Sequence, residues 1–239
     1  MWNLFVKEIN IFFNHLTGYL LLIAFLIAIG LVVWVFPETS VLEYGFADLE
    51  ALFIYTPFIF VFLVPALTMR MIAEEKKSGT WELLITSPLS NSQIILAKYF
   101  AALSLVVLAL LPTLLYYYSI YQLGDPVGNL DSAGYFGSFI GLILIGAVFS
   151  AIGLFSSSVT ENQITAFVIG VFIGFFLYFG LSAFSSLQRN NLALVMEELS
   201  LSYHYNSLGR GVIDSSNLLY FFALISILLV LTGINIKRK

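Results

Sequence analysis

Six stretches of the sequence, each 19 residues or longer, contain no Asp, Glu, Lys, Arg or His. A helix needs about 20 mainly apolar residues to cross a hydrocarbon core about 30 Å thick. Only 10% of the 239 residues are charged, against about 25% in soluble domains, so the chain cannot cover a water-facing surface with polar groups. We therefore predict an all-α integral membrane protein with a single domain over residues 1–239. The expected spans are approximately residues 18–36, 51–71, 97–121, 134–157, 164–186 and 216–236.

The composition also excludes several classes of site and partner. A net charge of −4 offers no basic footprint for phosphate backbones, so we expect no nucleic-acid partner. Cysteine is absent, which excludes disulfides, thiol catalysis and thiolate metal sites. Two histidines are too few for a His-rich metal site. We accordingly predict no catalytic residue and no metal site.

The positive charges predict the orientation of the chain. Six spans place both termini on one side, and the side richer in Lys and Arg is normally the cytoplasmic one. If the termini are cytoplasmic, the outside segments carry only Arg189 and Arg210. The basic residues inside are then Lys7, Arg70, Lys76, Lys77, Lys98, Lys237, Arg238 and Lys239. We therefore expect both termini in the cytoplasm. The first span ends without a small-residue cleavage site, so we expect a permanent helix and not a cleaved signal peptide.

The spans lack the groups on which ion-coupled transport usually depends. Ionisable residues inside a membrane cost about 2.5–3.5 kcal/mol each on insertion scales, and they mark ion pathways. The central parts of all six predicted spans contain none. The phosphate-binding motif GxxxxGK[ST] and the metalloprotease motif HExxH do not occur. Glu74-Glu75 resembles the start of a paired-glutamate protease motif, but Gly79 stands where that family has Arg. If the chain moves a substrate against a gradient, a separate subunit must supply the energy and needs a docking surface.

Residues 2–16 predict a helix that is too polar to cross the membrane. Asn3, Lys7, Asn10 and Asn14 recur at helical spacing, and aromatic and aliphatic residues fill the opposite side. Such a helix lies in the membrane interface, here on the cytoplasmic side. Two readings stay open: a simple membrane anchor, or a lateral collar that contacts a partner.

The longest outer loop, about residues 187–216, contains a second amphipathic segment at 190–200. Its apolar residues follow the i, i+3, i+4, i+7 pattern of a short helix. They are Leu192, Val195, Met196 and Leu199. This helix either forms a lid over an exit path or covers the ends of the spans, and the sequence does not separate these readings. The other outer loops are too short for a folded substrate-binding domain, so recognition requires the spans, this loop or another polypeptide.

Residues 70–98 form the only inner segment large enough to be a docking surface. The turn residues Ser78-Gly79-Thr80 predict a break with an N-cap, and a short helix over 81–85 follows. Pro88 ends that helix, and Ser90 with Gln93 forms a capping box for the helix that carries Lys98 into the third span. We expect exposed Trp and Leu side chains on the short helix. It either fits a groove on a partner or lies among lipid headgroups.

The stretch from Arg70 to Pro88 resembles the coupling segment of ABC-2 type permeases, which are the membrane subunits of ATP-driven exporters. The matching positions are Ala73-Glu74-Glu75-Lys76-Lys77-Ser78-Gly79-Thr80, Glu82-Leu83-Leu84 and Ser87-Pro88. The six-span layout agrees, so the resemblance covers essentially the whole chain. Within the family, the chain is similar to permeases associated with bacterial gliding motility, on overall similarity and not on a short motif.

The resemblance implies partners, a location and a role for this segment. An ABC ATPase subunit would dock under residues 73–88 and carry the ATP and Mg, so this chain needs no cofactor of its own. A second permease half would complete the path as a homodimer or heterodimer, with membrane lipid and a further extracytoplasmic subunit as other partners. The membrane would be the bacterial cytoplasmic (inner) membrane. The implied coupling residues are Glu74, Glu75, Lys76, Gly79, Thr80, Trp81, Glu82, Leu83, Leu84, Ser87 and Pro88. Trp81 stands where the family often has a smaller apolar residue.

Small residues and prolines within the spans predict close packing and bending. The small-residue motifs allow helices to approach closely, within one subunit or between two. They are Gly137 and Gly141 in the fourth span, and Ala166, Gly170 and Gly174 in the fifth. Pro57, Pro65 and Pro112 are hinge candidates, because proline removes a helix hydrogen bond.

Two functions agree with these features. The first is the permease subunit of an ATP-driven exporter. The second is a membrane anchor that links an ATPase to a motility or secretion machine without transport. They differ in whether a path crosses the membrane. The substrate is not encoded in any motif of the chain.

Overall fold

The computed structural model describes residues 1–44, 46–187, 191–211 and 214–237. In these residues every regular element is a helix, and six helical stretches are long and apolar enough to cross a membrane. The all-α fold and the six predicted spans are thereby confirmed. The stretches are Leu16–Trp34, Glu50–Lys77, Asn91–Leu123, Ser132–Val159, Gln163–Ser186 and Ser215–Ile236.

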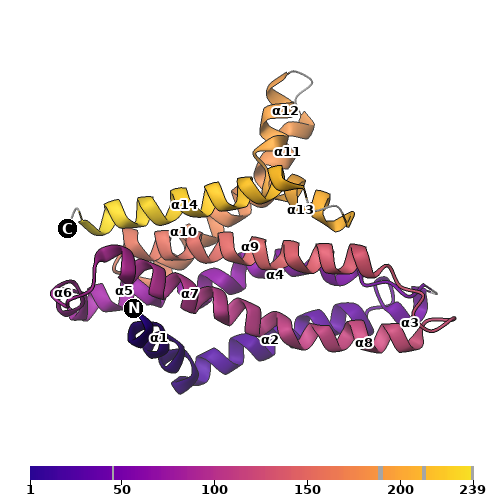
Figure 1. Ribbon diagram of the computed structural model, residues 1–239, viewed down its shortest axis with the longest axis horizontal. Coiled ribbons are helices and arrows are strands. Elements are labelled where there is room, and N and C mark those ends of the chain that lie inside the picture. Colours follow the sequence, from indigo (N-terminus) through magenta and orange to yellow (C-terminus); the bar gives the residue numbers. More distant parts are fainter. Residues whose placement is uncertain (45, 188–190, 212–213, 238–239) are drawn as a thin grey trace.

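The spans are assembled from shorter helices, shown in Figure 1. In chain order the elements are α1 (Trp2–Asn14), α2 (Leu16–Trp34), α3 (Val41–Tyr44), α4 (Glu50–Thr68), α5 (Arg70–Lys77), α6 (Thr80–Ile85), α7 (Asn91–Leu110), η1 (Leu111–Thr113), α8 (Leu114–Leu123), α9 (Ser132–Val159), α10 (Gln163–Phe175), η2 (Phe176–Gly180), α11 (Leu181–Leu187), α12 (Asn191–Glu198), α13 (Leu201–Gly209) and α14 (Ser215–Lys237). The helices α1, α5 and α6 lie together at one end of the bundle, which we call the α6 end (Figure 1).

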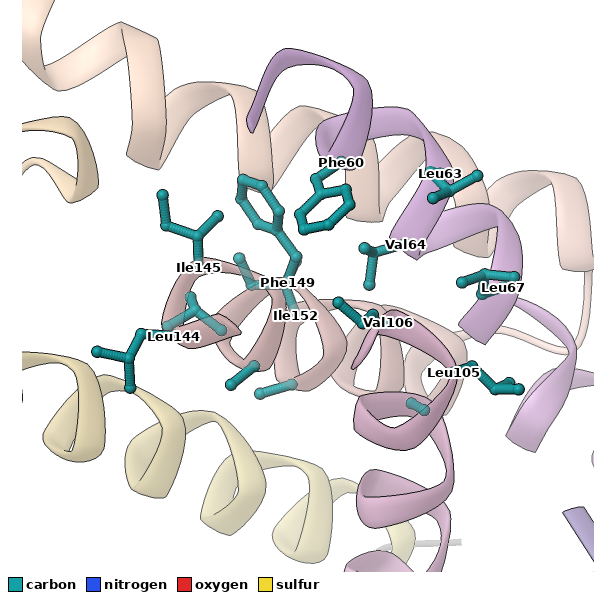
Figure 2. Close-up of a cluster of buried hydrophobic side chains, with 14 of the residues drawn as sticks. Phe60, Leu63, Val64, Leu67, Leu105, Val106, Leu144, Ile145, Phe149 and Ile152 are labelled. Atoms are coloured by element: carbon teal, nitrogen blue, oxygen red, sulfur yellow. The ribbon is translucent and has the colours of Figure 1, made fainter. Parts of the chain in front are cut away.

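The fourth span, α9, is the centre of the bundle. Of its most apolar window 78% is buried, against 22% for α2. The helices α4, α7, α10, α13 and α14 all pack against it. Figure 2 shows the core where α4, α7 and α9 meet. Its labelled side chains are Phe60, Leu63, Val64, Leu67, Leu105, Val106, Leu144, Ile145, Phe149 and Ile152.

Several small residues of α9 and α10 lie where neighbouring helices of the chain approach closely. A Cβ at Gly137 would lie 2.5 Å from the Leu208 carbonyl oxygen of α13. A Cβ at Gly141 would lie 2.8 Å from the Tyr205 ring of the same helix. In α10, Ala166 is buried and a Cβ at Gly170 would lie 3.0 Å from the Ser156 hydroxyl, whereas one at Gly174 would lie an ordinary 3.4 Å from the Phe149 ring. These contacts are all within one chain.

The turn between the fourth and fifth spans is shorter than the polar run at 156–163 suggests. Ser156, Ser157 and Ser158 belong to α9 and are buried, and the non-helical link is only residues 160–162. The buried hydroxyls are satisfied within the helix, because Ser156 donates to the Gly153 carbonyl and Ser158 to the Phe155 carbonyl.

The fifth span, predicted for residues 164–186, is present but is not one continuous α-helix. A π-helical turn, η2, interrupts it after Phe175. Beyond that turn, α11 and α12 stand away from the side of the bundle (Figure 1). Wide helical turns of this kind are common at functional sites, and a count of apolar residues does not reveal them.

The last loop contains the predicted helix and one more. The prediction for 190–200 is met by α12, but Val195 and Leu199 are about half exposed, so the apolar side is not packed against the bundle. The side chain of Leu192 lies outside the described residues. The unpredicted helix, α13, packs against α9 and buries Leu201, Tyr205 and Leu208.

His204 of α13 is buried. Its Nδ1 lies 2.7 Å from the Asn217 side-chain oxygen, and its Nε2 lies 2.7 Å from the Glu198 carbonyl oxygen. The described residues contain no group of three or more His, Cys, Asp or Glu side chains placed to hold a metal.

Candidate functional site

The segment α5–α6 follows α4 at the α6 end of the bundle, where α5 completes the second candidate span, Glu50–Lys77. After Thr68 the helix is interrupted at Met69 and continues as α5 to Lys77. Gly79 then reverses the chain with φ +72°, a left-handed conformation that glycine adopts at little cost. Gly79 is also the N-cap position of α6, and no side chain caps that helix. The turn predicted at residues 78–80 is therefore present, but the predicted N-cap hydrogen bond to a hydroxyl is not.

Ser157 of α9 holds the junction between α4 and α5 in place. Its Oγ accepts hydrogen bonds from the N–H groups of Ile72 (3.1 Å) and Ala73 (3.0 Å) and donates one to the Met69 carbonyl (2.9 Å). Lys76 bonds to the Ser158 carbonyl in addition. A side chain of a neighbouring span therefore satisfies backbone groups at the interrupted helix end.

The prediction that Trp81 is exposed is wrong. Its side chain is 7% exposed and belongs to the apolar core, whereas Leu83 of the same helix is 72% exposed. Leu84 is half-buried against the core, and Glu82 is exposed. The local sequence does not show how close α6 lies to the bundle. In the structure its first turn is close enough for Trp81 to be buried in the core. The tryptophan thus fixes α6, and Leu83 with Glu82 forms its outward surface.

The remaining predicted coupling residues surround this helix. Glu74, Thr80 and Pro88 are exposed, and the Ser78 and Thr80 hydroxyls lie 2.9 Å apart across the turn. The Ser87 hydroxyl donates to the Leu84 carbonyl (2.6 Å) and closes α6.

The predicted capping box at the start of α7 is confirmed. The Gln93 N–H donates to the Ser90 hydroxyl (3.3 Å), and the Ser90 N–H donates to the Gln93 side chain (3.0 Å).

A buried lysine joins this segment to the N-terminal helix. The side chain of Lys98, on α7, is fully buried, and its Nζ lies 2.6 Å from Glu8 Oε1 of α1. The same Nζ donates to the Met71 carbonyl (2.7 Å) and forms an ion pair with Glu75 Oε2 (2.9 Å), both on α5. On the surface, Lys7 Nζ lies 3.2 Å from Glu75 Oε1.

This cluster satisfies the physical requirement for burying an ammonium. A buried charge is costly unless it is paired and its donors are satisfied. Lys98 donates hydrogen bonds to Glu8 Oε1 and to the Met71 carbonyl, and Glu75 Oε2 adds a second carboxylate at ion-pair distance without accepting a hydrogen bond. Sequence reasoning used Lys98 only for orientation and missed Glu8. One feature of the sequence could have revealed Glu8: it lies four residues after Leu4, so both share one face of α1. In the structure both residues are buried.

Two of the three proline hinge candidates lie in an α-helix, and the third lies in a 3-10 stretch. Pro57 and Pro65 lie inside α4, which remains helical through both. Pro65 contacts α10, because a Cβ at Gly170 would lie 3.1 Å from its Cβ. Pro112 lies in η1, the short 3-10 stretch that divides the third span into α7 and α8.

Two cavities lie at opposite ends of α4. A cleft of about 1270 Å³ opens at the end away from α6, between α4, α9, α11 and α13. Its charged lining residues are Asp48, Glu50, Asp131 and Arg210. A smaller cavity of about 420 Å³ at the α6 end lies between α1, α4 and α5.

One face of α4 connects the two cavities. Ile54 and Phe58 line the cleft, and Ala66 lines the smaller cavity. Phe62 lies between them at the same i, i+4 spacing and is about half exposed, as are Ile54 and Phe58. The side of α4 that is not packed into the core therefore runs from one cavity to the other.

Six spans, a helix held beyond their ends and a cleft between them define a polytopic membrane transport component. The family model described as ABC-2 family transporter protein matches residues 37–237, and the chain belongs to this family. The match includes α4 to α14 and the whole α5–α6 segment, and it begins after α1 and α2. No curated protein matches the chain in sequence. As a member of the family the chain is not itself the catalytic subunit, and the family implies an ABC ATPase partner and a membrane dimer.

Proposed function

We propose that this chain is the permease half of an ATP-driven exporter, with a separate ABC ATPase docked on residues 73–88. The observation that carries the proposal is the geometry of α6. Buried Trp81 and the Gly79 turn hold the helix beyond the end of the spans, and Leu83 is left 72% exposed. A fixed helix with one exposed apolar residue beside the Glu82 carboxylate suits insertion into a partner's groove.

The cleft and the exposed face of α4 favour a conduit over a membrane anchor. An anchor has no use for a cleft of about 1270 Å³ at the end away from the docking helix. In the proposed assembly, a second permease half, either another copy or a different chain, faces α4 and closes the path. Pro57, Pro65 and Pro112 allow α4 and the third span to bend as α6 is displaced.

The remaining assignments follow from charge and resemblance. The α6 end faces the cytoplasm, with both termini there, in the inner membrane of a bacterium. Of the basic residues used for that orientation, Arg189, Arg238 and Lys239 lie outside the described residues, as does the side chain of Lys237. The association with gliding motility rests on overall sequence similarity. ATP and Mg belong to the ATPase, and a further extracytoplasmic subunit contacts the end with the cleft. The charge-poor face of α4 suits lipid-linked, peptide or polysaccharide cargo.

Affinity purification in mild detergent tests the docking surface. We expect an ABC ATPase to co-purify with the wild-type chain and to be lost from the double variant Glu82→Lys, Leu83→Asp. A matched control is Leu42→Asp, Glu43→Lys, which changes an equally exposed Leu–Glu pair on α3 at the other end of the bundle. If wild type brings down no ABC ATPase, or both double variants retain it equally, the proposed docking surface is wrong.

A further inference from the structure

The N-terminal helix contacts the docking segment through buried charge. α1 packs against α7 and α2, while the smaller cavity, about 420 Å³, lies between α1 and α5. Across that gap, Lys98 bridges Glu8 of α1 and Glu75 of α5 at 2.6 and 2.9 Å.

We propose that α1 is a moving part of the coupling machinery, and that Glu8 and Lys98 are positioning residues that make α1, α5 and the start of α7 move as one body. The inference rests on the proposed function, because it assigns a route for the movement that a docked ATPase imposes on α6. It also replaces both earlier readings of α1, the passive anchor and the collar that contacts a partner.

The three elements joined at Lys98 lead into three different spans. α1 is followed after one residue, His15, by α2. α5 continues α4 after one residue, Met69, and α7 is itself the first part of the third span. The Lys98 ammonium therefore connects the first, second and third spans at the α6 end of the bundle.

Separating these elements would leave a charge without its partner in a buried site. Glu8 and Lys98 are both almost fully buried, so water cannot readily replace either group. Lys98 also donates to the Met71 carbonyl, which ties it to the α5 backbone as well as to the Glu75 side chain. A displacement of α5 is therefore passed to α1 and α7. The exposed pair Lys7–Glu75 adds little, because half of the Lys7 side chain is in solvent.

A single engineered cysteine can report this transmission, because the chain has no cysteine of its own. Asn206→Cys places a thiol in the lining of the cleft, which opens at the end of α4 away from α6, whereas Lys98 contacts α1 and α5 at the α6 end. The readout is the rate of maleimide labelling of the co-purified permease–ATPase complex with and without ATP and Mg. We expect nucleotide to change this rate about fivefold or more, the lower limit of typical coupling between distant sites.

The test variant is Glu8→Leu, Lys98→Met, which replaces the buried pair by apolar residues and leaves Glu75 paired with Lys7. We expect it to keep the ATPase bound and to lose the nucleotide response of the labelling rate. Lys7→Met is the matched control, since it removes only the exposed pair with Glu75, and it should respond as wild type does. If the double variant does not fold, Glu8→Gln, which keeps the volume and an acceptor oxygen but removes the charge, should weaken the response.

The outcomes separate this inference from the proposed function. Loss of the response with the ATPase still bound supports it. If the folded variant responds to nucleotide as wild type does, the inference is wrong, but the proposed exporter is unaffected. The same holds if nucleotide does not change the labelling rate in the wild-type complex. Failure of any ABC ATPase to co-purify with wild type removes the proposed function itself.

Discussion

At the scale of single residues, α9 and α4 meet with almost no space between them. A Cβ at Gly153 would lie 1.8 Å from Thr68 Oγ1. Thr68 cannot easily turn away, because it is fully buried and its hydroxyl donates to the Val64 carbonyl (2.9 Å). One turn later, Ser157 bonds to the start of α5. These residues set the position from which the docking segment leaves the bundle.

We therefore predict that Gly153→Ala destabilises the protein. Overpacking of this kind costs about 1–3 kcal/mol, and about 2–4 °C of melting temperature follows from each kcal/mol in a chain of this size. Thermal unfolding of the purified protein in detergent measures the change. Gly174→Ala is the control, because its new methyl group would meet Phe149 at an ordinary 3.4 Å. Equal melting temperatures for the two variants would contradict the packing described for α4 and α9.

Residue-scale features were the hardest to predict from the sequence. The proposed docking residues were assigned from their order in the chain. The capping box at Ser90 was predictable because its two partners are three residues apart. The Glu8–Lys98 pair spans 90 positions of sequence, and no local periodicity relates such distant residues. The burial of Trp81 likewise depends on the position of α6 against the bundle, and the sequence of α6 alone does not determine that position.

At the scale of elements, the direction of α6 depends on the turn at Gly79. Its φ of +72° is unfavourable for a residue with a side chain, although a Cβ there would meet no atom within 4 Å. The constraint is therefore on the backbone alone. Asparagine visits the left-handed region more readily than β-branched residues do.

This predicts that Gly79→Asn and Gly79→Val behave differently. Valine should force the turn to rearrange at a cost of about 1–2 kcal/mol, and the misdirected α6 should bind the ATPase about tenfold more weakly. Asparagine should keep most of the binding. Titration of the purified permease with the purified ATPase measures both affinities. Equal affinities for the two variants would show that the orientation of α6 does not depend on this turn.

The long elements were predictable because a membrane span must be apolar along its whole length. The spans therefore stand out in composition without any knowledge of packing. What was missed at this scale is irregular: the π-helical turn η2, the departure of α11 from the bundle, and the helix α13. The turn η2 and the helix α13 are too short to stand out in composition. Their positions, and the direction of α11, depend on contacts between helices that are distant in sequence.

At the scale of the whole molecule, the helices form a bundle with α6, the proposed docking helix, at one end and a cleft at the other. The exposed face of α4 lies between these two features. Charge alone indicated which end should carry the docking helix, because the basic residues gather between Arg70 and Lys98 and in the terminal segments. That a cleft lies at the opposite end could not be predicted, since it arises from helices of the second, fourth and fifth spans and from α13, in the loop between the fifth and sixth spans.

The central claim is that α6 contacts an ABC ATPase and is not merely a helix among lipid headgroups. A photo-crosslinking amino acid at Leu83, irradiated in intact cells, tests it most directly. We predict a crosslinked polypeptide that contains a GxxxxGK[ST] motif, and none from the same group placed at Leu42 on α3, which is similarly exposed at the other end. Capture of lipid alone at Leu83, or of the same ATPase at both positions, would contradict the account.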